Sequence, residues 1–598
     1  LISTVLSRRR LLAGLAAGAL ATRLPGTSKA SVDPAPLKFD PVTTSNLDTI
    51  TLPEGFNWHV VVSWGDPLWS RGEEFDPVTR GTGTSQELAF GDNNDGMSLF
   101  NRDGRSILVV NNEYVNRHVF HGNRDSKKPE NVDDMRKAKA GHGVSIAEIS
   151  QRNGRWQVVK DSKFNRRITA STPIDIVGPA AGHDLLKTSQ DPSGRRALGT
   201  YANCANGRTP WGTYLTCEEN FNAYFSASDE FFEPTKQMYR YGIGRNDWGY
   251  NWAAFDPRFD VSKNPNEPNR MGYVVEIDPF DRNSTPRKRT ALGRFKHENA
   301  EVVIAKSGQV VVYMGDDERG EFLYRFVSDD KFVDGGNSAD LLDKGKLYVA
   351  KFNDDMTGKW LELTPQSTGM ASRADICIHT RQAASKVGGT TMDRPEWVAA
   401  HPDRPEVYCS LTNNKNRGRK TNRGGDAMPV GGPNPRRKNL YGQIVRWYPQ
   451  QADHGAPEFK WDLFAIAGNP YVHDDARAGS PNIILENMFN SPDGLSFDSR
   501  GQLWIRTDGN YSNQGDFAGM GNNQLLVGDP DSGDILRFLV GPRQCELTGL
   551  VWSPDRKTMF LGIQHPGAKG NGNFPGSKGD VPRSSIVAIR RDDGGVIG

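Results

Sequence analysis

Residues 297–321 read HENAEVVIAKSGQVVVYMGDDERGE, and this stretch decides the fold. Two short apolar runs, VVIA and VVVYM, flank the polar turn KSGQ, a pattern that predicts an antiparallel hairpin. Acidic residues stand at both outer ends: Glu298 precedes the first run, and Asp316 and Asp317 follow the second. Because the strands of a hairpin run in opposite directions, we expect these carboxylates to share one edge of the sheet.

The same pattern recurs along the chain. Each copy has an apolar run, a polar turn such as RDG, SRG or PDR, and a second apolar run with polar groups at the outer ends. The other copies are DNNDGMSLFNRDGRSILVVNNEY (92–114), RPEWVAAHPDRPEVYCSLTNN (394–414), SPDGLSFDSRGQLWIRTDG (491–509), CELTGLVWSPDRKTMFLGIQHPG (545–567) and the looser GTYANCANGRTPWGTYLTCEEN (199–220). One or two further strand-like runs follow each hairpin, so a unit contains about four strands.

Six such units predict an all-β protein: a six-bladed β-propeller with long loop insertions. The last unit has only SSIVAIRR after its hairpin, and NWHVVVSW (Asn57–Trp64) is the candidate N-terminal strand that closes it. Closure removes exposed sheet edges, which otherwise promote aggregation. We expect residues 31–598 to form this propeller as a single domain. The alternative is a series of unrelated β-sandwiches, but no linker in the sequence separates such domains.

The N-terminal region has the features of an export signal. SRRRLLAGLAAGALATRLPGTSKA combines Arg8, Arg9 and Arg10 with a short apolar run and a small-residue cleavage site, Ser28–Ala30. Residues 1–30 are therefore predicted to be a twin-arginine signal peptide, read by the twin-arginine export machinery. This predicts a periplasmic or secreted protein with no stable membrane insertion after processing. The alternative is an amphipathic or anchor helix, for which the apolar run is short.

The net charge and the cysteine content indicate which partners and which free thiol to expect. A formal net charge of +2 gives no field that would attract a polyanion, so no nucleic-acid partner is expected. The five cysteines form no CxxC pair and are odd in number, so at least one thiol is left over from any pairing within the chain. Cys217, beside two glutamates in GTYLTCEEN, is the candidate.

The predicted propeller would gather the hairpin ends at one channel mouth. The starts of first strands carry Asp95, Glu298, Glu396, Asp493 and Glu546, and the ends of second strands carry Glu113, Cys217, Glu218, Glu219, Asp316, Asp317, Asn413, Asp508 and His565. So many carboxylates repel one another without cations. Numerous oxygen ligands favour calcium, and one thiolate favours a transition metal such as iron or zinc. The alternative for any single residue is a turn cap or a pair with arginine.

A long basic loop, KNRGRKTNRGGDAMPVGGPNPRRK, follows the hairpin at 394–414. The same geometry would hold this loop over the acidic mouth, where it would suit an anionic substrate that bridges metals and arginines. Arg423 is the first candidate for a phosphate contact, and Arg417 is the next. The alternative is a solvated, flexible loop.

Several of these motifs together resemble the PhoX-type bacterial alkaline phosphatases. They are WGTYLTCEEN, HENAEV, RPEWV, LTNN…NLYGQIVRW and SPDGL, with the twin-arginine leader, and they span nearly the whole chain. The resemblance implies a monomeric, exported propeller whose catalytic domain hydrolyses small-molecule phosphomonoesters during phosphate starvation. It also implies a mixed, oxo-bridged cofactor of Fe³⁺ and Ca²⁺ with a cysteine ligand to iron.

Carried over by motif, the resemblance makes Cys217 the thiolate ligand. Cys217 and the basic-loop candidate Arg423 are the expected catalytic residues. The expected metal ligands are Cys217, Glu218, Glu219, Glu298, Asp316, Glu396 and Asp493, with no separate cofactor-binding residues. The implied reaction is metal-assisted in-line displacement at phosphorus. The alternatives are an iron-free, calcium-dependent propeller hydrolase of the lactonase or phytase type, and a propeller that binds ligands without catalysis.

Overall fold

Short apolar runs between turns give this chain a structure whose regular elements are mainly antiparallel strands. The structure is a computed structural model that describes residues 37–598, so the predicted signal peptide, residues 1–30, lies outside the described residues. All six predicted hairpins are present. They are the antiparallel pairs β2–β3, β9–β10, β13–β14, β18–β19, β22–β23 and β26–β27. The all-β prediction is thereby confirmed.

The first two hairpins belong to separate sheets. One sheet has the order β2-β3-β4-β5, with β6 also paired to β4; its strands are β2 (Asn94–Arg102), β3 (Arg105–Asn112), β4 (Gly143–Arg152), β5 (Arg155–Val158) and β6 (Arg166–Ile168). The other has the order β8-β7-β12-β11-β10-β9, with strands β7 (Pro173–Val177), β8 (Arg196–Leu198), β9 (Asn203–Arg208), β10 (Tyr214–Glu218), β11 (Val274–Ile277) and β12 (Arg287–Arg289). In this sheet β12 and β7 run parallel.

The third and fourth hairpins share one nine-stranded sheet. Its strands are β13 (Glu301–Ile304), β14 (Gln309–Gly315), β15 (Leu323–Lys331), β16 (Gly345–Phe352), β17 (Thr357–Glu362), β18 (Pro395–Ala400), β19 (Val407–Leu411), β20 (Gln443–Pro449) and β21 (Glu458–Ile466). The two halves join because the outer strands β17 and β21 pair with each other. The described chain therefore contains five sheets, although it contains six hairpin units.

The last two sheets have four strands each. One is β22-β23-β24-β25, with strands β22 (Pro492–Phe497), β23 (Leu503–Thr507), β24 (Gln524–Gly528) and β25 (Ile535–Val540). The other is β1-β28-β27-β26, with strands β1 (Phe56–Ser63), β26 (Glu546–Trp552), β27 (Thr558–Gln564) and β28 (Ser585–Arg591). As the sequence predicted, β1 supplies the missing outer strand and pairs antiparallel with β28.

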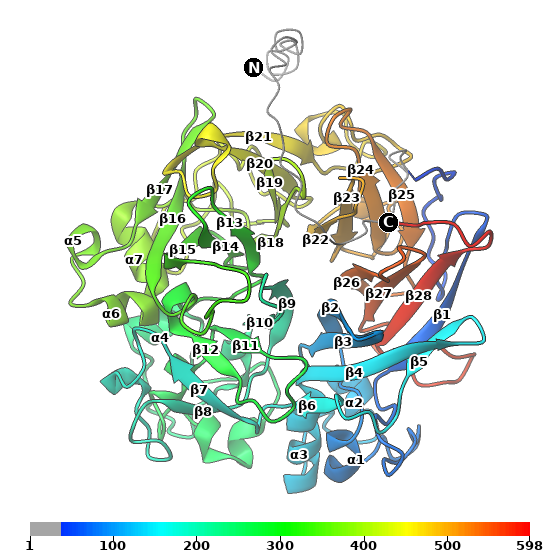
Figure 1. Ribbon diagram of the computed structural model, residues 1–598, viewed down its shortest axis with the longest axis horizontal. Helices are drawn as coiled ribbons and strands as arrows, with labels where there is room; N and C mark the ends of the chain where they lie inside the picture. Colours follow the sequence, from blue (N-terminus) through cyan, green and yellow to red (C-terminus); the bar gives the residue numbers. More distant parts are fainter. Residues whose placement is uncertain (1–36) are drawn as a thin grey trace. The chain divides into compact units, whose positions relative to one another are not determined.

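The first strands of the hairpins lie next to one another around a common centre (Figure 1). Strand β2 contacts β26 and β9, and the series continues through β13, β18 and β22 back to β26. Glycine permits this close approach. A Cβ at Gly315, the last residue of β14, would lie 2.3 Å from the carbonyl oxygen of Glu396. The strands on either side could not pack this closely with a larger residue at that position.

Helices are few and lie in the insertions between strands. They are α1 (Gly83–Glu87), α2 (Arg117–Phe120), α3 (Val132–Gly141), α4 (Lys236–Arg240), α5 (Pro365–Thr368), α6 (Arg373–Ile378) and α7 (Thr380–Val387). Across residues 37–598, none of these helices has the length and apolar character needed to span a membrane.

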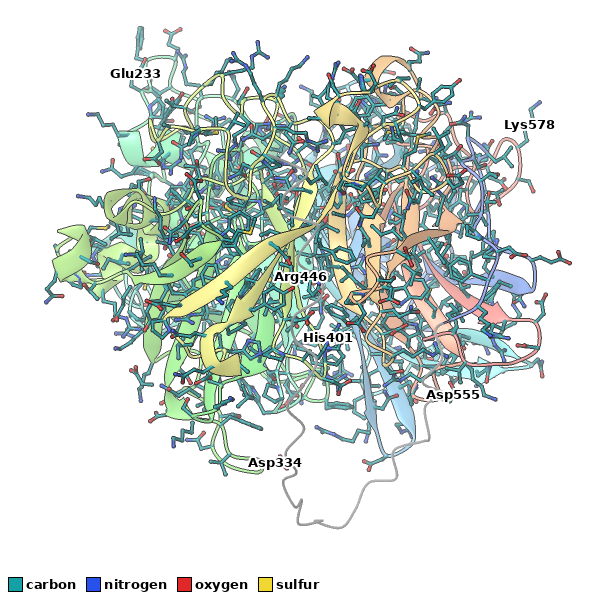
Figure 2. All side chains as sticks on the ribbon, turned by 90° about the horizontal axis from the view of Figure 1, so that it is seen from above. Glu233, Asp334, His401, Arg446, Asp555 and Lys578 are labelled. Carbon is teal, nitrogen blue, oxygen red and sulfur yellow. The ribbon has the colours of Figure 1, made fainter. Side chains whose placement is uncertain are left out.

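Turns and insertions lie on opposite sides of the sheets. In Figure 2, Asp334 in the connection between β15 and β16 and Asp555 in the turn between β26 and β27 lie at one edge of the molecule. Glu233 and Lys578 belong to the insertions after β10 and β27, and they lie at the other edge. The outer ends of the hairpins thus open towards the side that carries these long insertions.

Candidate metal centre

A cavity of about 290 Å³ lies where the outer ends of the six hairpins meet. Its wall contains nine carboxylates, contributed by all six hairpins: Asp95, Glu113, Glu219, Glu298, Asp317, Glu396, Asp493, Asp508 and Glu546. The other charged and hydrogen-bonding residues of the wall are Cys204, Asn220, Arg394, Gln564 and His565, and Tyr114, Tyr224, Trp248 and Tyr250 add aromatic surface. A cavity with this many acidic side chains is suited to binding cations.

The cavity residues on the first strands of the hairpins share one local backbone geometry. Asp95, Cys204, Glu396 and Asp493 are each the second residue of the first strand of their hairpin. The residue two positions earlier has a positive φ in every case, and the same holds before Glu546: the residues are Asn93 (φ 42°), Ala202 (56°), Arg394 (58°), Ser491 (51°) and Gln544 (57°). Left-handed backbone is uncommon for residues other than glycine and concentrates at functional sites.

In three of these hairpins the pairing register also shifts across the cavity residue. Shifts occur between Asn94 and Met97, between Pro395 and Val398, and between Pro492 and Leu495. A bulge inserts one unpaired residue and turns the local side chains away from the regular alternation. Because the same register shift recurs in different hairpins, separate strands direct their acidic side chains into one cavity.

The cavity side chains form four groups that could each hold a cation, and three of these groups overlap. Within each group the ligand atoms lie within 4.8 Å of one another. The groups are Asp95, Glu113 and Cys204; Cys204, Glu219 and Glu298; Glu298, Glu396 and Asp493; and Asp508, Glu546 and His565. Because Cys204 and Glu298 each belong to two groups, neighbouring cations could share a ligand.

Burial and mutual repulsion perturb most of the acids. Burial, reinforced by neighbouring carboxylates, raises the pKa well above its ordinary value for Glu113, Glu219, Glu298, Glu396, Asp493 and Glu546. Burial likewise raises the pKa of Asp95 to about 7. Burial would also raise the pKa of Asp317, but the charges of Arg394 and Lys296 outweigh it and lower that pKa. Without cations, most of this cluster is therefore driven towards its protonated form.

Cys204 is the sulfur that reaches the cluster. Its Sγ lies 3.3 Å from Oδ2 of Asp95 and 3.0 Å from Oε1 of Glu298. The residues predicted from the sequence do not include Cys204, because it lies in the loosest copy of the repeat. One signal could have found it: in NCANG the cysteine occupies the place that an acid takes in the other hairpins.

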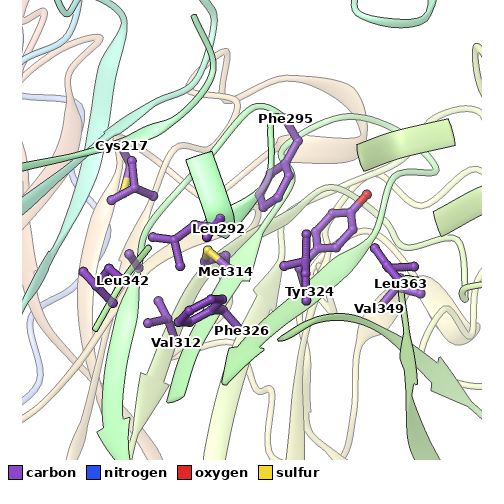
Figure 3. Packing of buried hydrophobic residues seen from close by; sticks show 14 of the residues in the cluster. Cys217, Leu292, Phe295, Val312, Met314, Tyr324, Phe326, Leu342, Val349 and Leu363 are labelled. Atoms are coloured by element: carbon purple, nitrogen blue, oxygen red, sulfur yellow. The ribbon is translucent and has the colours of Figure 1, made fainter. Parts of the chain in front are cut away.

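Cys217, predicted as the thiolate ligand and a catalytic residue, lies elsewhere, so this prediction was wrong. Its side chain is fully buried in an apolar cluster with residues such as Leu292, Phe295 and Met314, as Figure 3 shows. Cys217 lies near the end of β10, as expected, but within the regular strand its side chain points into the apolar packing. Glu219 follows the last residue of β10, where the chain leaves the strand, and its side chain lines the cavity.

Glu218 and Asp316 are also absent from the cavity wall, and both pair with buried cations instead. Oε1 of Glu218 accepts a hydrogen bond from Nζ of Lys288 at 2.6 Å, and Oε2 accepts one from the backbone N–H of Gly272 at 3.0 Å. Asp316 accepts a hydrogen bond from Nε of Arg381 at 2.8 Å. Their predicted metal roles were therefore wrong: Asp316 follows the alternative of a pair with arginine, whereas Glu218 pairs with a lysine. Glu219, Glu298, Glu396 and Asp493 do line the cavity.

The basic loop supplies no residue to the cavity wall. Arg423 is exposed, with its guanidinium 5.5 Å from the ring centre of Tyr239, and it is not part of the cavity wall, so its role as a phosphate contact stays a prediction. Nε of Arg417 donates to Asp393 at 2.6 Å in the interior. The arginine in the wall is Arg394, which begins its own hairpin copy. Its outer-end position was a usable signal.

Arg394 is held rigidly against two acids. Its Nε and Nη2 donate to the two carboxylate oxygens of Asp317, each at 2.7 Å, and Nη2 lies 3.2 Å from Oε1 of Glu396. A bidentate pair of this kind fixes the plane of the guanidinium. The side chain retains 20% exposure, so one edge faces the open space of the cavity.

Known proteins resemble this chain over most of its length. The family model described as alkaline phosphatase PhoX matches residues 37–567. The PhoX of Pseudomonas fluorescens, solved with vanadate, a transition-state analogue, is 53% identical, with a TM-score of 0.90 over 94% of this chain and 99% of that chain.

Two remote likenesses carry no argument about function. A gluconolactonase of Xanthomonas campestris is 10% identical with a TM-score of 0.31 over 93% of this chain and 98% of that one. An α-L-arabinofuranosidase of Fusarium graminearum is 11% identical with a TM-score of 0.31, over 89% and 98%. No curated protein sequence matches the chain. The family match and the solved relative both extend over nearly the whole described chain, so the chain belongs to the alkaline phosphatase PhoX family and is a phosphatase.

Proposed function

We propose that this phosphatase hydrolyses phosphomonoesters in the acidic cavity with the help of bound iron and calcium ions. The observation that carries the proposal is the convergence of nine carboxylates and the Cys204 thiol in one buried space. In the reaction a water oxygen forms a bond to phosphorus while the ester P–O bond breaks. The products are an alcohol and inorganic phosphate, and the alcohol takes up the proton that its oxygen needs.

The donor set fits a mixed cluster of cations. Hard carboxylate oxygens in this number are ligands for calcium, and one thiolate among them favours a transition metal such as iron. Oε1 of Glu219 is buried and accepts no hydrogen bond from any described residue, so it has a free lone pair for a cation. Arg394 is the one lysine or arginine in the described cavity wall, and a single guanidinium cannot balance nine acids. We infer that Cys204 takes the role first given to Cys217.

The protein's own groups would bind and orient the substrate. When bound, the cations supply Lewis-acid polarisation of the phosphoryl oxygens in an in-line displacement. Arg394 would donate to a non-bridging oxygen, since Asp317 and Glu396 hold its guanidinium in place. This arrangement costs no reorganisation when charge develops in the transition state. The relative from Pseudomonas fluorescens binds vanadate, a transition-state analogue, which supports the same chemistry here.

The proposal also includes the architecture of the protein and the compartment in which it acts. We infer that the six hairpin units act as six blades of a propeller, with β1 closing the last blade, because the first strands contact one another around a ring. Residues 31–598 would then form one catalytic domain. We further propose that the protein is a monomer, exported by the twin-arginine route to the periplasm or beyond and used in phosphate starvation.

Metal analysis and turnover on one sample test the proposal. Protein purified without chelators should contain iron and calcium and should hydrolyse p-nitrophenyl phosphate at alkaline pH. Treatment with a chelator should remove both the metals and the activity. An active enzyme that contains calcium but no iron would contradict the mixed cluster, while full activity without metals would contradict the mechanism as a whole.

A further inference from the structure

We propose that Trp248 is a fixed platform for the alcohol part of the substrate, which gives the enzyme a preference for phosphomonoesters with a flat ring next to the ester oxygen. The inference rests on the proposed function, because it assumes that the phosphoryl group binds among the acids. It adds the specificity residue and the substrate class: aryl phosphates rather than aliphatic ones.

Trp248 combines two properties that rarely occur together. It lines the acidic cavity, and its side chain is nevertheless 53% exposed. The other aromatic residues of the wall, Tyr114, Tyr224 and Tyr250, are much less exposed. A large indole left in water at the edge of a site exposes apolar surface that a ligand can cover.

The backbone that carries this indole is held from several directions. The N–H of Trp248 donates to the carbonyl oxygen of Ala223 at 2.8 Å. The next N–H, that of Gly249, donates to Oδ1 of Asp247 at 2.7 Å. Nη1 of Arg117 donates to the carbonyl oxygen of Gly249 at 3.1 Å. These contacts tie the loop to two other segments, so a ligand that stacks on the ring loses little binding energy to ordering the protein.

Neighbouring rings and a cation restrain the loop further. The ring of Tyr250 stacks on that of Tyr224, with centroids 4.3 Å apart and planes inclined by 23°. Nζ of Lys296 lies 5.6 Å from the ring centre of Trp248, within the range of a cation–π contact. The segment that carries the indole is therefore held beside the acids, while the indole stays exposed.

The size of the cavity decides which part of a substrate reaches Trp248. A volume of about 290 Å³ lies at the lower end of small-molecule sites, and the proposed cations would fill part of it. The remaining space suits a phosphoryl group but not a nucleoside or an aryl alcohol. The alcohol part would then extend past the rim, where Trp248 is the large exposed apolar side chain of the described wall.

The test compares Trp248→Ala with wild type, as purified with its metals, on phenyl phosphate and on glycerol 2-phosphate. We expect the KM for phenyl phosphate to rise about 3- to 10-fold, the range that one aromatic contact gives, with kcat changed less than about twofold. The KM for glycerol 2-phosphate should change less than about twofold. Inhibition by phenylphosphonate should weaken to the same extent as the KM, and inhibition by methylphosphonate should not.

Two further variants separate a loss of the ring contact from a general effect of the substitution. Trp248→Phe should recover most of the loss, because it retains a flat ring. Phe231→Ala is the matched control, since Phe231 is 80% exposed on the same insertion but does not line the cavity; it should behave as wild type. An equal change for both esters, or no change for either, would overturn the platform. If wild-type enzyme hydrolysed neither ester, the proposed function would fail first, and the inference with it.

Discussion

The direction in which a side chain points, more than its position along the strand, determines whether it belongs to the metal centre. Cys204 and Cys217 lie on the adjacent strands β9 and β10 and are both buried. The sulfur of Cys204 faces two carboxylates, whereas that of Cys217 packs among apolar side chains. The two residues form a natural pair of test and control.

Replacement of each cysteine by alanine should therefore give opposite results. Cys204→Ala removes the proposed thiolate ligand, so we expect loss of iron, of visible absorption and of nearly all phosphatase activity. Cys217→Ala should keep metal and activity but lower the free energy of unfolding by about 1–3 kcal/mol, because it leaves a small cavity in packed core. Elemental analysis, absorption spectra and denaturant unfolding measure these effects. Iron loss in Cys217→Ala alone would contradict the assignment.

A buried histidine outside the cavity links stability to pH. His142 is fully buried; its Nδ1 lies 2.6 Å from the carbonyl oxygen of Ala138, and its Nε2 lies 2.9 Å from the hydroxyl of Tyr224. Burial, with a smaller contribution from the charge of Arg167, lowers the pKa of His142 from 6.5 to about 3. Between these two values the unfolded chain binds a proton at this site and the folded chain does not.

The free energy of unfolding should accordingly fall as pH falls from about 6.5 towards 3. One such group contributes up to about 1.4 kcal/mol per pH unit within that window. We expect His142→Gln to show a shallower fall than wild type between pH 6.5 and 4, measured by chemical denaturation. His118→Gln, at an exposed position, is the control and should keep the wild-type slope. Parallel slopes for all three proteins would refute the linkage.

At the scale of the element, the hairpin is the unit that builds the site. Five hairpins approach the cavity through a non-glycine residue with positive φ, and several then shift register. Neighbouring hairpins also touch through glycine: a Cβ at Gly315 would meet the backbone carbonyl oxygens of Glu396 at 2.3 Å and Pro395 at 2.4 Å. Backbone atoms cannot rotate away as the end of a side chain can.

Gly315→Ala should therefore separate β14 from β18 and displace the cavity residue Glu396. We expect a loss of about 1–3 kcal/mol of stability or more, with a clear drop in bound metal and in kcat. Gly244→Ala is the matched control, because a Cβ there meets no atom within 4 Å, and it should be nearly neutral. Wild-type stability in Gly315→Ala would show that the strands can move apart freely.

At the scale of the whole molecule, the cavity draws on every hairpin, so bound cations should stabilise all of them together. Cations that bind the folded state alone add about 2.7 kcal/mol per site at a concentration 100 times the Kd. Removal of metal should lower the Tm by several degrees in thermal unfolding, and calcium and iron together should restore it. An unchanged Tm after verified removal of metal would mean that bound cations do not stabilise the hairpins.

The pairing of β1 with the last sheet is also a feature of the whole molecule. Strand β1 is separated from its partner β28 by nearly the whole chain, yet the two pair through register positions such as Trp58 with Ile589. The sequence predicted this pairing because the last unit lacked one strand. It did not predict that β17 and β21 pair and merge two units into one sheet. Neither strand carries a signal for a partner so distant in sequence.

The sequence by itself determined the six hairpins and the edge at which their ends meet, since apolar runs and turn residues act over a few positions. It also determined family membership through local motifs. The tertiary structure decided which ends reach the cavity. Glu218 and Asp316 are engaged by Lys288 and Arg381, which come from distant segments. A register shift reverses the face of a strand, and a distant cation neutralises an acid, so neither effect can be read from the residues beside it in sequence.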